Sequence, residues 1–149
     1  MIVNGQTLLK DAPIVDMLDH KAQHSSGLSY GLTEVGYDIR VKQGFWLHPF
    51  MWKVKLASSI ERFNIPPFLA MTVHDKSTLA RRGVSVQNTT GEPGWDGHLT
   101  LELSLNQLYP VYIEAGQPID ACWFHEIQEL ADYGSGKYQD QPDRPIGAR

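Results

Sequence analysis

A strict alternation of apolar and polar side chains over residues 98–105 is the feature that most constrains the fold. Leucine occupies every odd position of this segment, and the even positions hold His98, Thr100, Glu102 and Ser104. Successive side chains of a strand point to opposite faces, so the pattern predicts a strand with one face in the core. Glu102 is therefore expected on the polar face of a strand whose other face is buried.

Short runs with β character recur along the rest of the chain, separated by turns rich in Gly, Pro and Asn. The expected strands cover residues 37–41, 45–47, 52–56, 68–73, 83–87, 99–105, 111–113 and 121–127. Many short strands within 149 residues predict a single, mainly β domain of the sandwich, jelly-roll or distorted-barrel type. Within this array of strands, residues 76–82 are the segment expected to be helical.

The two ends of the chain carry weaker signals. Residues 7–22 can hold a short helix, which we expect after Pro13 because proline interrupts a helix. Residues 24–36 are rich in Ser and Gly and are expected to form a loop. Residues 132–149 are polar and rich in Gly, Pro and Asp, a composition typical of a flexible tail.

The charge and the cysteine content exclude several classes of function. A formal net charge of −4 gives no basic field to attract nucleic acid or an anionic membrane. The sequence has no apolar run long enough to span a membrane and no signal peptide at its start. The single cysteine, Cys122, excludes an internal disulfide and favours a reducing cytoplasm. It lies in an apolar run, so we expect it in the core rather than acting as a nucleophile.

A basic segment, Lys76–Gly83, is a candidate site for phosphate. In a helix, Ser77 and Arg81 share one face, and the first backbone N–H groups attract anions. Lys76 and Arg81 add positive charge, and arginine grips phosphate with two hydrogen bonds. The spacing taken alone favours a simpler interpretation, an exposed helix with solvated basic side chains.

Glu102 is a candidate general base, because partial burial raises the pKa of a strand carboxyl that faces a cleft. Taken alone, an exposed glutamate paired across the sheet is the more common case. Zinc-dependent nucleobase deaminases need cysteine ligands in a PCxxC segment, and this chain has one cysteine and six unpatterned histidines. We therefore expect no zinc, and we expect His98 and His125 to lie on sheet faces.

Four motifs, in order along the chain, resemble those of the dCTP deaminase branch of the dUTPase-like superfamily. They are the early strand Gly-Tyr-Asp-Ile-Arg-Val at 36–41, the segment at 76–83, Asn-Thr-Thr-Gly-Glu-Pro-Gly-Trp-Asp-Gly-His-Leu-Thr-Leu-Glu-Leu at 88–103, and Gly-Lys-Tyr-Gln-Asp-Gln at 136–141. The resemblance implies a dUTPase-like distorted jelly roll or β-barrel with one or two short helices. It also implies a homotrimer with active sites at subunit interfaces, and a single domain over residues 1–149 with 132–149 as a C-terminal lid.

The same resemblance implies a reaction, the metal-free deamination of dCTP, or of a 5-substituted dCTP, to the corresponding dUTP and ammonia. Glu102 would be the general base, with Ser77 and Arg81 orienting the water, the glutamate and the nucleotide. The protein would hold no metal of its own, and Mg²⁺ would arrive with the triphosphate. The resemblance assigns substrate binding to Lys76, Thr78, Leu79, Ala80, Thr89, Thr90, Glu92, Thr100, Leu101, Tyr133, Lys137 and Gln141.

Two alternatives stay open at this stage. In dUTPases an aspartate in the turn before the strand activates water, and Glu92 occupies that turn here. A dUTPase-like or bifunctional pyrophosphohydrolase that yields dUMP is therefore the second hypothesis, and a nucleotide-sensing trimer without turnover is the third. The link from Thr90 to Pro93 is shorter than is typical of the family, and the chain is short. A compact, virus-encoded enzyme acting in the host cytoplasm is one interpretation of this shortening.

Overall fold

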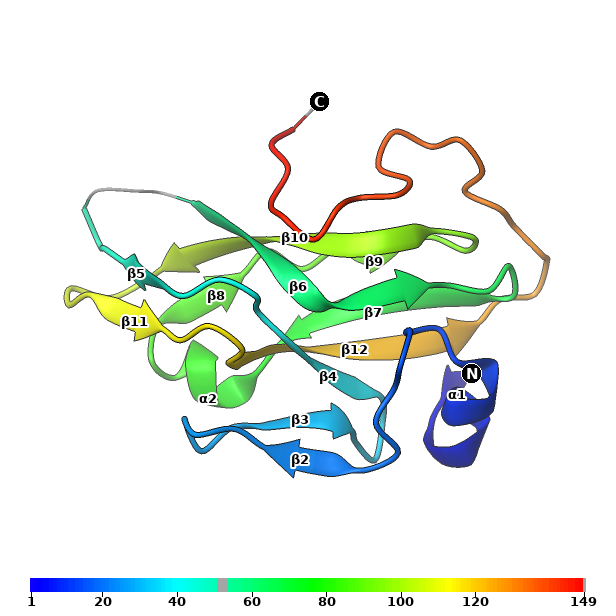
Figure 1. Cartoon of the computed structure of the whole chain (residues 1–149), viewed down its shortest axis with the longest axis horizontal. Helices are drawn as coiled ribbons and strands as arrows, with labels where there is room; N and C mark the ends of the chain where they lie inside the picture. The colour runs from blue at the N-terminus through cyan, green and yellow to red at the C-terminus, as the bar shows by residue number, and fades with distance from the viewer. Residues whose placement is uncertain (51–53, 149) are drawn as a thin grey trace.

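The computed structural model describes residues 1–50 and 54–148, which form three antiparallel sheets and two short helices (Figure 1). The largest sheet has the order β2-β3-β4-β12-β7-β9, with β1 paired to β12. Its strands are β1 (Ile2–Val3), β2 (Lys21–Gln23), β3 (Ser29–Leu32), β4 (Tyr37–Arg40), β7 (Leu69–Asp75), β9 (Thr90–Gly91) and β12 (Pro118–Glu126). The second sheet, with the order β6-β10-β8, contains β6 (Lys55–Asn64), β8 (Val84–Val86) and β10 (Asp96–Leu105). The third pairs β5 (Phe45–Leu47) with β11 (Val111–Ile113), and the helices are α1 (Gly5–Asp11) and α2 (Ser77–Ala80).

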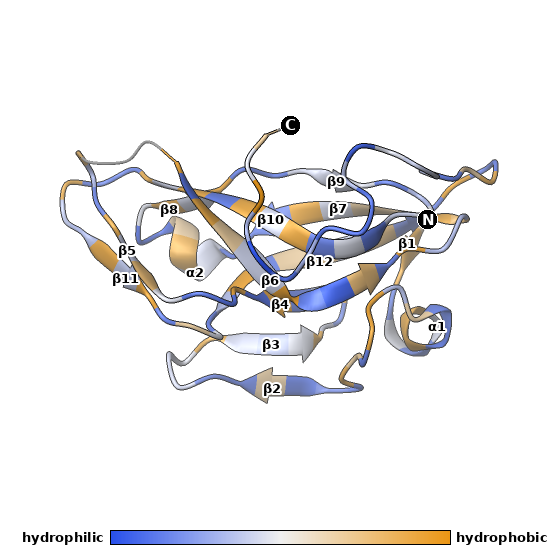
Figure 2. Cartoon of the chain, turned by 45° about the horizontal axis from the view of Figure 1, so that its top comes forward, coloured by the Kyte–Doolittle hydropathy of each residue, from blue (hydrophilic) through white to orange (hydrophobic). Residues whose placement is uncertain are grey.

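The core lies between the two larger sheets. Leu99, Leu101 and Leu103 of β10 are buried in the same apolar cluster as Met71 of β7 and Phe124 of β12. Figure 2 shows apolar and polar residues alternating along β10. The expected mainly β fold and the alternating strand are therefore confirmed, and the strand begins two residues before His98, at Asp96.

The strand β6 is longer than the sequence indicated. We expected a strand over residues 52–56, of which 52 and 53 lie outside the described residues, and β6 runs to Asn64. The pattern was obscured because Ser58, Ser59 and Glu61 are polar and yet buried. Ser59 Oγ accepts the Leu99 N–H at 2.9 Å and donates to the Glu61 carbonyl at 2.7 Å, so burial leaves this hydroxyl satisfied.

The prediction of a helix after Pro13 is wrong, because α1 lies before this residue. Ala12 ends the helix in the left-handed conformation, with φ 45° and ψ 54°. A residue that precedes proline is kept out of the helical region, so the helix has to end there. Beyond it, Ile14 is buried and forms a bridge to Phe63 of β6.

The loop expected over residues 24–36 is in part a hairpin. The strands β2 and β3 are joined by a turn in which the His24 N–H donates to the Leu28 carbonyl at 2.9 Å. Gly27 adopts φ +80° in this turn, a conformation that glycine accepts without strain. Composition suggested a loop because β3 is stabilised by pairing with β2 and β4, and this pairing leaves no pattern in the local sequence.

The C-terminal segment 132–149 contains no helix or strand in its described part, and it still lies directly along β10 (Figure 1). Gln141 forms a parallel bridge with Gly97, and its carbonyl accepts the His98 N–H at 2.9 Å. The Asp140 N–H donates to the Asp96 carbonyl at 2.9 Å. Tertiary hydrogen bonds therefore hold a segment whose composition alone indicated a loose tail.

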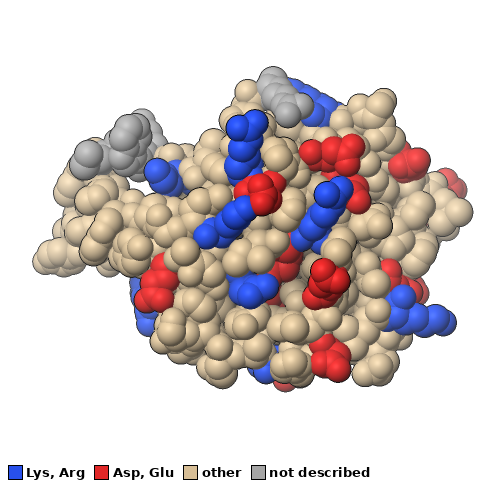
Figure 3. Space-filling view, viewed as in Figure 1, with Lys and Arg blue, Asp and Glu red and all other residues tan. Residues whose placement is uncertain are grey.

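Neither helix in the described part of the chain is long and apolar enough to cross a membrane. On the face shown in Figure 3, acidic and basic side chains are interspersed rather than gathered by sign.

Candidate active site

A cavity of about 470 Å³ lies beside β10 and brings together segments that are far apart in the sequence. Its wall combines the segment before β10, the strand itself and the C-terminal segment. Seven of the residues assigned to the site from the sequence line this cavity: Thr89, Thr90, Glu92, Thr100, Glu102, Tyr133 and Gln141.

Glu102 is the carboxyl group on β10 that faces this cavity. It is half-buried between Leu101 and Leu103, whose side chains point into the core. Burial raises the pKa of Glu102 above its usual value, because a desolvated carboxylate is less stable than the neutral acid. A carboxylate with a raised pKa is a better proton acceptor, which is the property required of a general base.

The C-terminal segment forms one side of the cavity, and hydrogen bonds fix its path. The Trp95 Nε1–H donates to the Tyr138 carbonyl at 2.8 Å, and the Tyr138 N–H donates to Tyr133 Oη at 3.1 Å. Gln139 Nε2 donates to the Gly94 carbonyl at 3.1 Å. Both tyrosines line the cavity, so these bonds shape the wall that faces Glu102.

A second cavity, of about 400 Å³, lies at α2. The helix begins one residue later and ends two residues earlier than the expected range 76–82, and Arg81 follows it as the C-terminal cap. The Arg81 N–H donates to the Ser77 carbonyl at 3.0 Å, so the two residues keep the spacing that was expected of them. This cavity is lined by Gly27, Leu28, Ser29, Asp75, Lys76, Ser77, Thr78 and Ala121.

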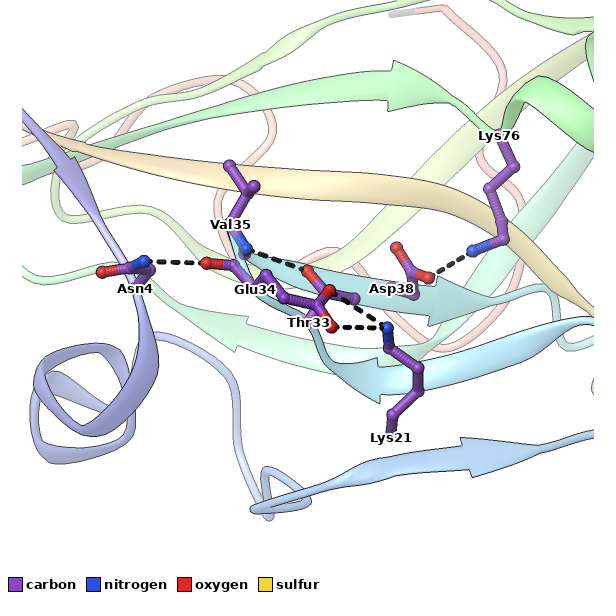
Figure 4. A network of polar contacts seen from close by, with 8 residues as sticks. Asn4, Lys21, Thr33, Glu34, Val35, Asp38 and Lys76 are labelled. Atoms are coloured by element: carbon purple, nitrogen blue, oxygen red, sulfur yellow. Dashed lines mark hydrogen bonds and ion pairs between the residues drawn. The ribbon is translucent and has the colours of Figure 1, made fainter.

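Lys76 forms an ion pair with Asp38 of β4, as Figure 4 shows. Their side chains are only 12% and 9% exposed. Burial raises the pKa of Asp38, although the ammonium of Lys76 acts in the opposite direction. The Lys76 ammonium is thus fixed by a carboxylate of its own chain beside the second cavity.

Within one chain, the two halves of the expected site are separate. The cavity at Glu102 and the cavity at α2 share no lining residue. Figure 1 shows the C-terminal segment along β10 and α2 on the far side of β8. Leu79 and Leu101 are buried in the core, so their side chains face away from solvent. Ala80 and Lys137 line neither cavity.

Six further residues line the Glu102 cavity and were not assigned to the site from the sequence: Leu56, Trp95, Leu99, Tyr138, Ile146 and Ala148. Trp95 and Tyr138 lie inside two of the recognised motifs, which was an available signal. Leu56 and Ile146 carry no such signal, because only the packing of β6 and the C-terminal segment against β10 brings them there.

Asp120 of β12 is a buried acid that the sequence did not reveal. It is 0% exposed, and within the described residues neither carboxyl oxygen has a hydrogen-bond partner. Burial raises its pKa well above the usual value, and Asp75, directly opposite on β7, adds to the effect. The run around it reads as an apolar strand, and Cys122 in the same run is buried in the core as predicted.

The two histidines that were expected on sheet faces lie on strands, His98 on β10 and His125 on β12, and both are partly exposed. His125 Nε2 lies 3.0 Å from Thr72 Oγ1, and His74 Nε2 lies 2.9 Å from the same oxygen. Over residues 1–50 and 54–148, no three His, Cys, Asp or Glu side chains are grouped to hold a metal ion.

Comparison with known proteins gives consistent results. Residues 36–127 match the family model described as dCTP deaminase-like. The chain is 33% identical to the dCTP deaminase of Anaplasma phagocytophilum, over 91% of this chain and 89% of that protein. It is 30% identical to the dCTP deaminase of Chloroflexus aurantiacus, over 89% and 88% of the two chains.

Solved structures share the fold at low sequence identity. The 2'-deoxycytidine 5'-triphosphate deaminase from Agrobacterium tumefaciens has a TM-score of 0.63 at 14% identity, and it covers 88% of this chain. This chain spans half the length of that one. The EIAV dUTPase has a TM-score of 0.56 at 15% identity, over 85% of this chain and 95% of that one. The dUTPase-like architecture is therefore confirmed.

Proposed function

The chain belongs to the dCTP deaminase-like family, and we propose that it deaminates dCTP to dUTP and ammonia with Glu102 as the general base. The observation that carries the proposal is the half-buried Glu102 carboxyl, which has a raised pKa and faces a cavity of about 470 Å³. A cavity of this volume lies within the range of small-molecule sites. Curated relatives named dCTP deaminase support the choice of substrate.

The proposed chemistry moves the two protons of one water molecule. Glu102 takes the first proton as the water oxygen attacks C4 of cytosine, and it passes this proton to ring N3. The second proton leaves the new C4 hydroxyl and joins the amino group, which departs as ammonia and leaves a carbonyl at C4. General-base catalysis of this kind contributes about 10²–10⁴-fold in rate.

We propose that the active site is completed by a second copy of the chain, in a homotrimer. Support comes from the separation of the Glu102 cavity from α2 within one chain. Ser77 of α2 and Arg81, which caps this helix, are exposed, so they are available to a neighbouring subunit. In this arrangement they orient the water and the nucleotide that occupy the partner's Glu102 cavity.

The triphosphate is proposed to meet the α2 segment together with Tyr133, Lys137 and Gln141 of the C-terminal segment, which then acts as a lid. Mg²⁺ is proposed to arrive on the triphosphate oxygens, because this ion keeps several water ligands and commonly binds through substrate phosphates. Ammonia release from dCTP with and without EDTA tests this requirement. The nucleotide product, separated by chromatography, shows whether the triphosphate stays intact.

A mixing experiment tests the shared site. Arg81→Ala and Glu102→Gln should each inactivate the pure protein. Refolding the two variants together should restore activity in about one site in four. In random trimers each of the two subunits that form a site supplies its native residue, Arg81 or Glu102, with a probability of about one half. If the mixture stays as inactive as its components, the two residues do not act in one site formed between subunits.

A second candidate function is pyrophosphohydrolysis of dUTP or dCTP. It is favoured by one observation, that Glu92 lines the same cavity as Glu102 and is exposed to solvent. Its signature is release of pyrophosphate together with dUMP from dUTP, or from dCTP when deamination also takes place. A Glu92→Gln variant that loses pyrophosphate release and keeps ammonia release would assign the two carboxylates to two separate reactions.

A further inference from the structure

The hydroxyl of Thr100 forms hydrogen bonds between the C-terminal segment and β10, the strand that carries Glu102. Thr100 and Glu102 are two residues apart on β10, so their side chains lie on the same face. Thr100 Oγ1 donates to Gln141 Oε1 at 3.2 Å and accepts the Ile146 N–H at 3.1 Å. Its proton and one lone pair are therefore used by two points of the segment, five residues apart.

Both partners of this hydroxyl line the cavity that Glu102 faces. The Gln141 backbone is already anchored, because its carbonyl accepts the His98 N–H. The hydrogen bonds of its backbone do not set the orientation of its side-chain amide. This orientation is set by Thr100 Oγ1, which donates to the amide oxygen. The two N–H donors of Gln141 are thereby turned away from Thr100.

At Ile146 the Thr100 hydroxyl holds the far end of the segment. Between Gln141 and Ile146, the ion pair of Lys42 with Asp143 joins side chains that are 43% and 60% exposed. An exposed ion pair adds little stability. The part-buried bond from the Ile146 N–H to Thr100 therefore contributes more to closure at this end of the cavity.

From this geometry we infer that Thr100 is a positioning residue, whose hydroxyl closes the C-terminal segment over the Glu102 cavity and sets the orientation of the Gln141 amide. The inference rests on the proposed function for its catalytic consequence. The closing role itself does not depend on the substrate. Thr100 then acts on the nucleotide through residues 141 and 146.

The first test measures closure without any nucleotide. Valine has nearly the shape of threonine and lacks the hydroxyl, whereas serine keeps the hydroxyl. Exchange of the Ile146 amide, followed by NMR, should become about tenfold faster in Thr100→Val, as expected for the loss of one hydrogen bond. Thr100→Ser should exchange within about threefold of the wild type. Equal exchange rates in all three proteins would overturn the inference.

A matched control separates closure from a general loss of stability. Thr72 on β7 also has a part-buried hydroxyl that contacts two side chains, and it lies outside the cavity. Thr72→Val should leave the exchange of the Ile146 amide unchanged. If it accelerates that exchange as much as Thr100→Val does, the effect is global and the inference fails.

The second test is kinetic and uses dCTP. Thr100→Val should raise KM about tenfold and lower kcat by less than about threefold, because the Glu102 carboxyl is intact while closure is weakened. Thr100→Ser should keep the KM for dCTP close to that of the wild type. A kcat that falls with KM unchanged would contradict a positioning role. If the wild-type protein does not turn over dCTP, the proposed function fails, and the exchange experiment still decides the role in closure.

Gln141→Leu is the second variant to use if Thr100→Val does not fold. It removes the amide that Thr100 binds and leaves β10 unaltered. We expect a raised KM for dCTP with little change in the exchange of the Ile146 amide, because the bond from Ile146 to Thr100 remains. Unchanged KM in this variant would remove the assigned role of the Gln141 amide.

Discussion

Lys76 forms an ion pair with Asp38, and this contact ties the start of α2 to β4. The pair is nearly buried, so each charge depends on the other for compensation. A double-mutant cycle with Asp38→Asn and Lys76→Met should give a coupling energy of about 1–3 kcal/mol in urea unfolding.

The exposed pair of Lys21 and Glu34, also drawn in Figure 4, is the control for this cycle. Its side chains are 41% and 82% exposed, so its coupling should be below about 1 kcal/mol. Equal coupling in the two pairs would show that burial does not strengthen the contact between Lys76 and Asp38.

Asp120 should make the stability of the protein depend on pH. Its pKa is raised in the folded state by burial and by Asp75, whereas the unfolded chain has an ordinary value near 3.8. The contribution of Asp120 to the stability of the folded state is therefore fully present below the pKa of the unfolded chain. It is lost as the pH rises through the pKa of Asp120 in the folded state. One such group changes the free energy of unfolding by at most about 1.4 kcal/mol per pH unit.

Asp120→Asn removes this titration, so the free energy of unfolding of the variant minus that of the wild type should increase from pH 4.5 to pH 8. Urea unfolding at several pH values measures this difference. The contributions of the other titrating groups to the free energy of unfolding are common to both proteins and cancel in it. A difference that stays constant or decreases with pH would contradict the buried, unpartnered state of Asp120.

Gly97 allows the C-terminal segment to approach β10. Its φ is +144°, and a Cβ atom there would lie 2.6 Å from the Gln141 backbone nitrogen. Gly97→Ala should displace the segment, raise KM for dCTP about tenfold or more and accelerate tryptic cleavage after Lys137. Gly116→Ala is the control, because its φ is +79° and its nearest atom is 3.8 Å away. Faster cleavage in both variants would indicate backbone strain rather than a steric clash with Gln141.

The sequence was most informative where one strand carries its own pattern. The alternation in β10 predicted which side chains are buried, and it placed Glu102 on the face that borders the cavity. It failed where burial depends on distant partners. Glu61 of β6 is buried because Arg40 donates to it at 2.8 Å through Nε and at 2.8 Å through its backbone N–H. No pattern in the local sequence predicts the pairing of Arg40 with Glu61.

The candidate site was also predictable only where its residues lie in local motifs. Seven of the residues that line the Glu102 cavity were assigned to the site by resemblance, whereas Leu56 and Ile146 reach it only through tertiary packing. The C-terminal segment reads as loose from its composition, and its hydrogen bonds to Trp95, Asp96 and His98 hold it in place. Burial of Asp120 depends on β4, β7 and β12 coming together, which the sequence of β12 alone does not contain.

The pH dependence of the reaction follows from the raised pKa of Glu102. The base must be ionised to accept a proton, so kcat/KM for dCTP should fall as the pH decreases through this pKa. The midpoint of the acid limb should lie above 4.5, the ordinary value for glutamate. A pH profile of ammonia release from dCTP measures it. An acid limb centred below 4.5 would contradict the effect of burial on the Glu102 carboxyl.

The role of Glu102 is tested by ammonia release from dCTP by the wild type, Glu102→Gln and Glu92→Gln, with the nucleotide products resolved by chromatography. We expect dUTP and ammonia from the wild type and a loss of about 10²–10⁴-fold or more in Glu102→Gln. Glu92→Gln should stay within about tenfold of the wild type, because this exposed carboxylate is not the base for deamination. Full deaminase activity in Glu102→Gln would show that Glu102 is not the general base.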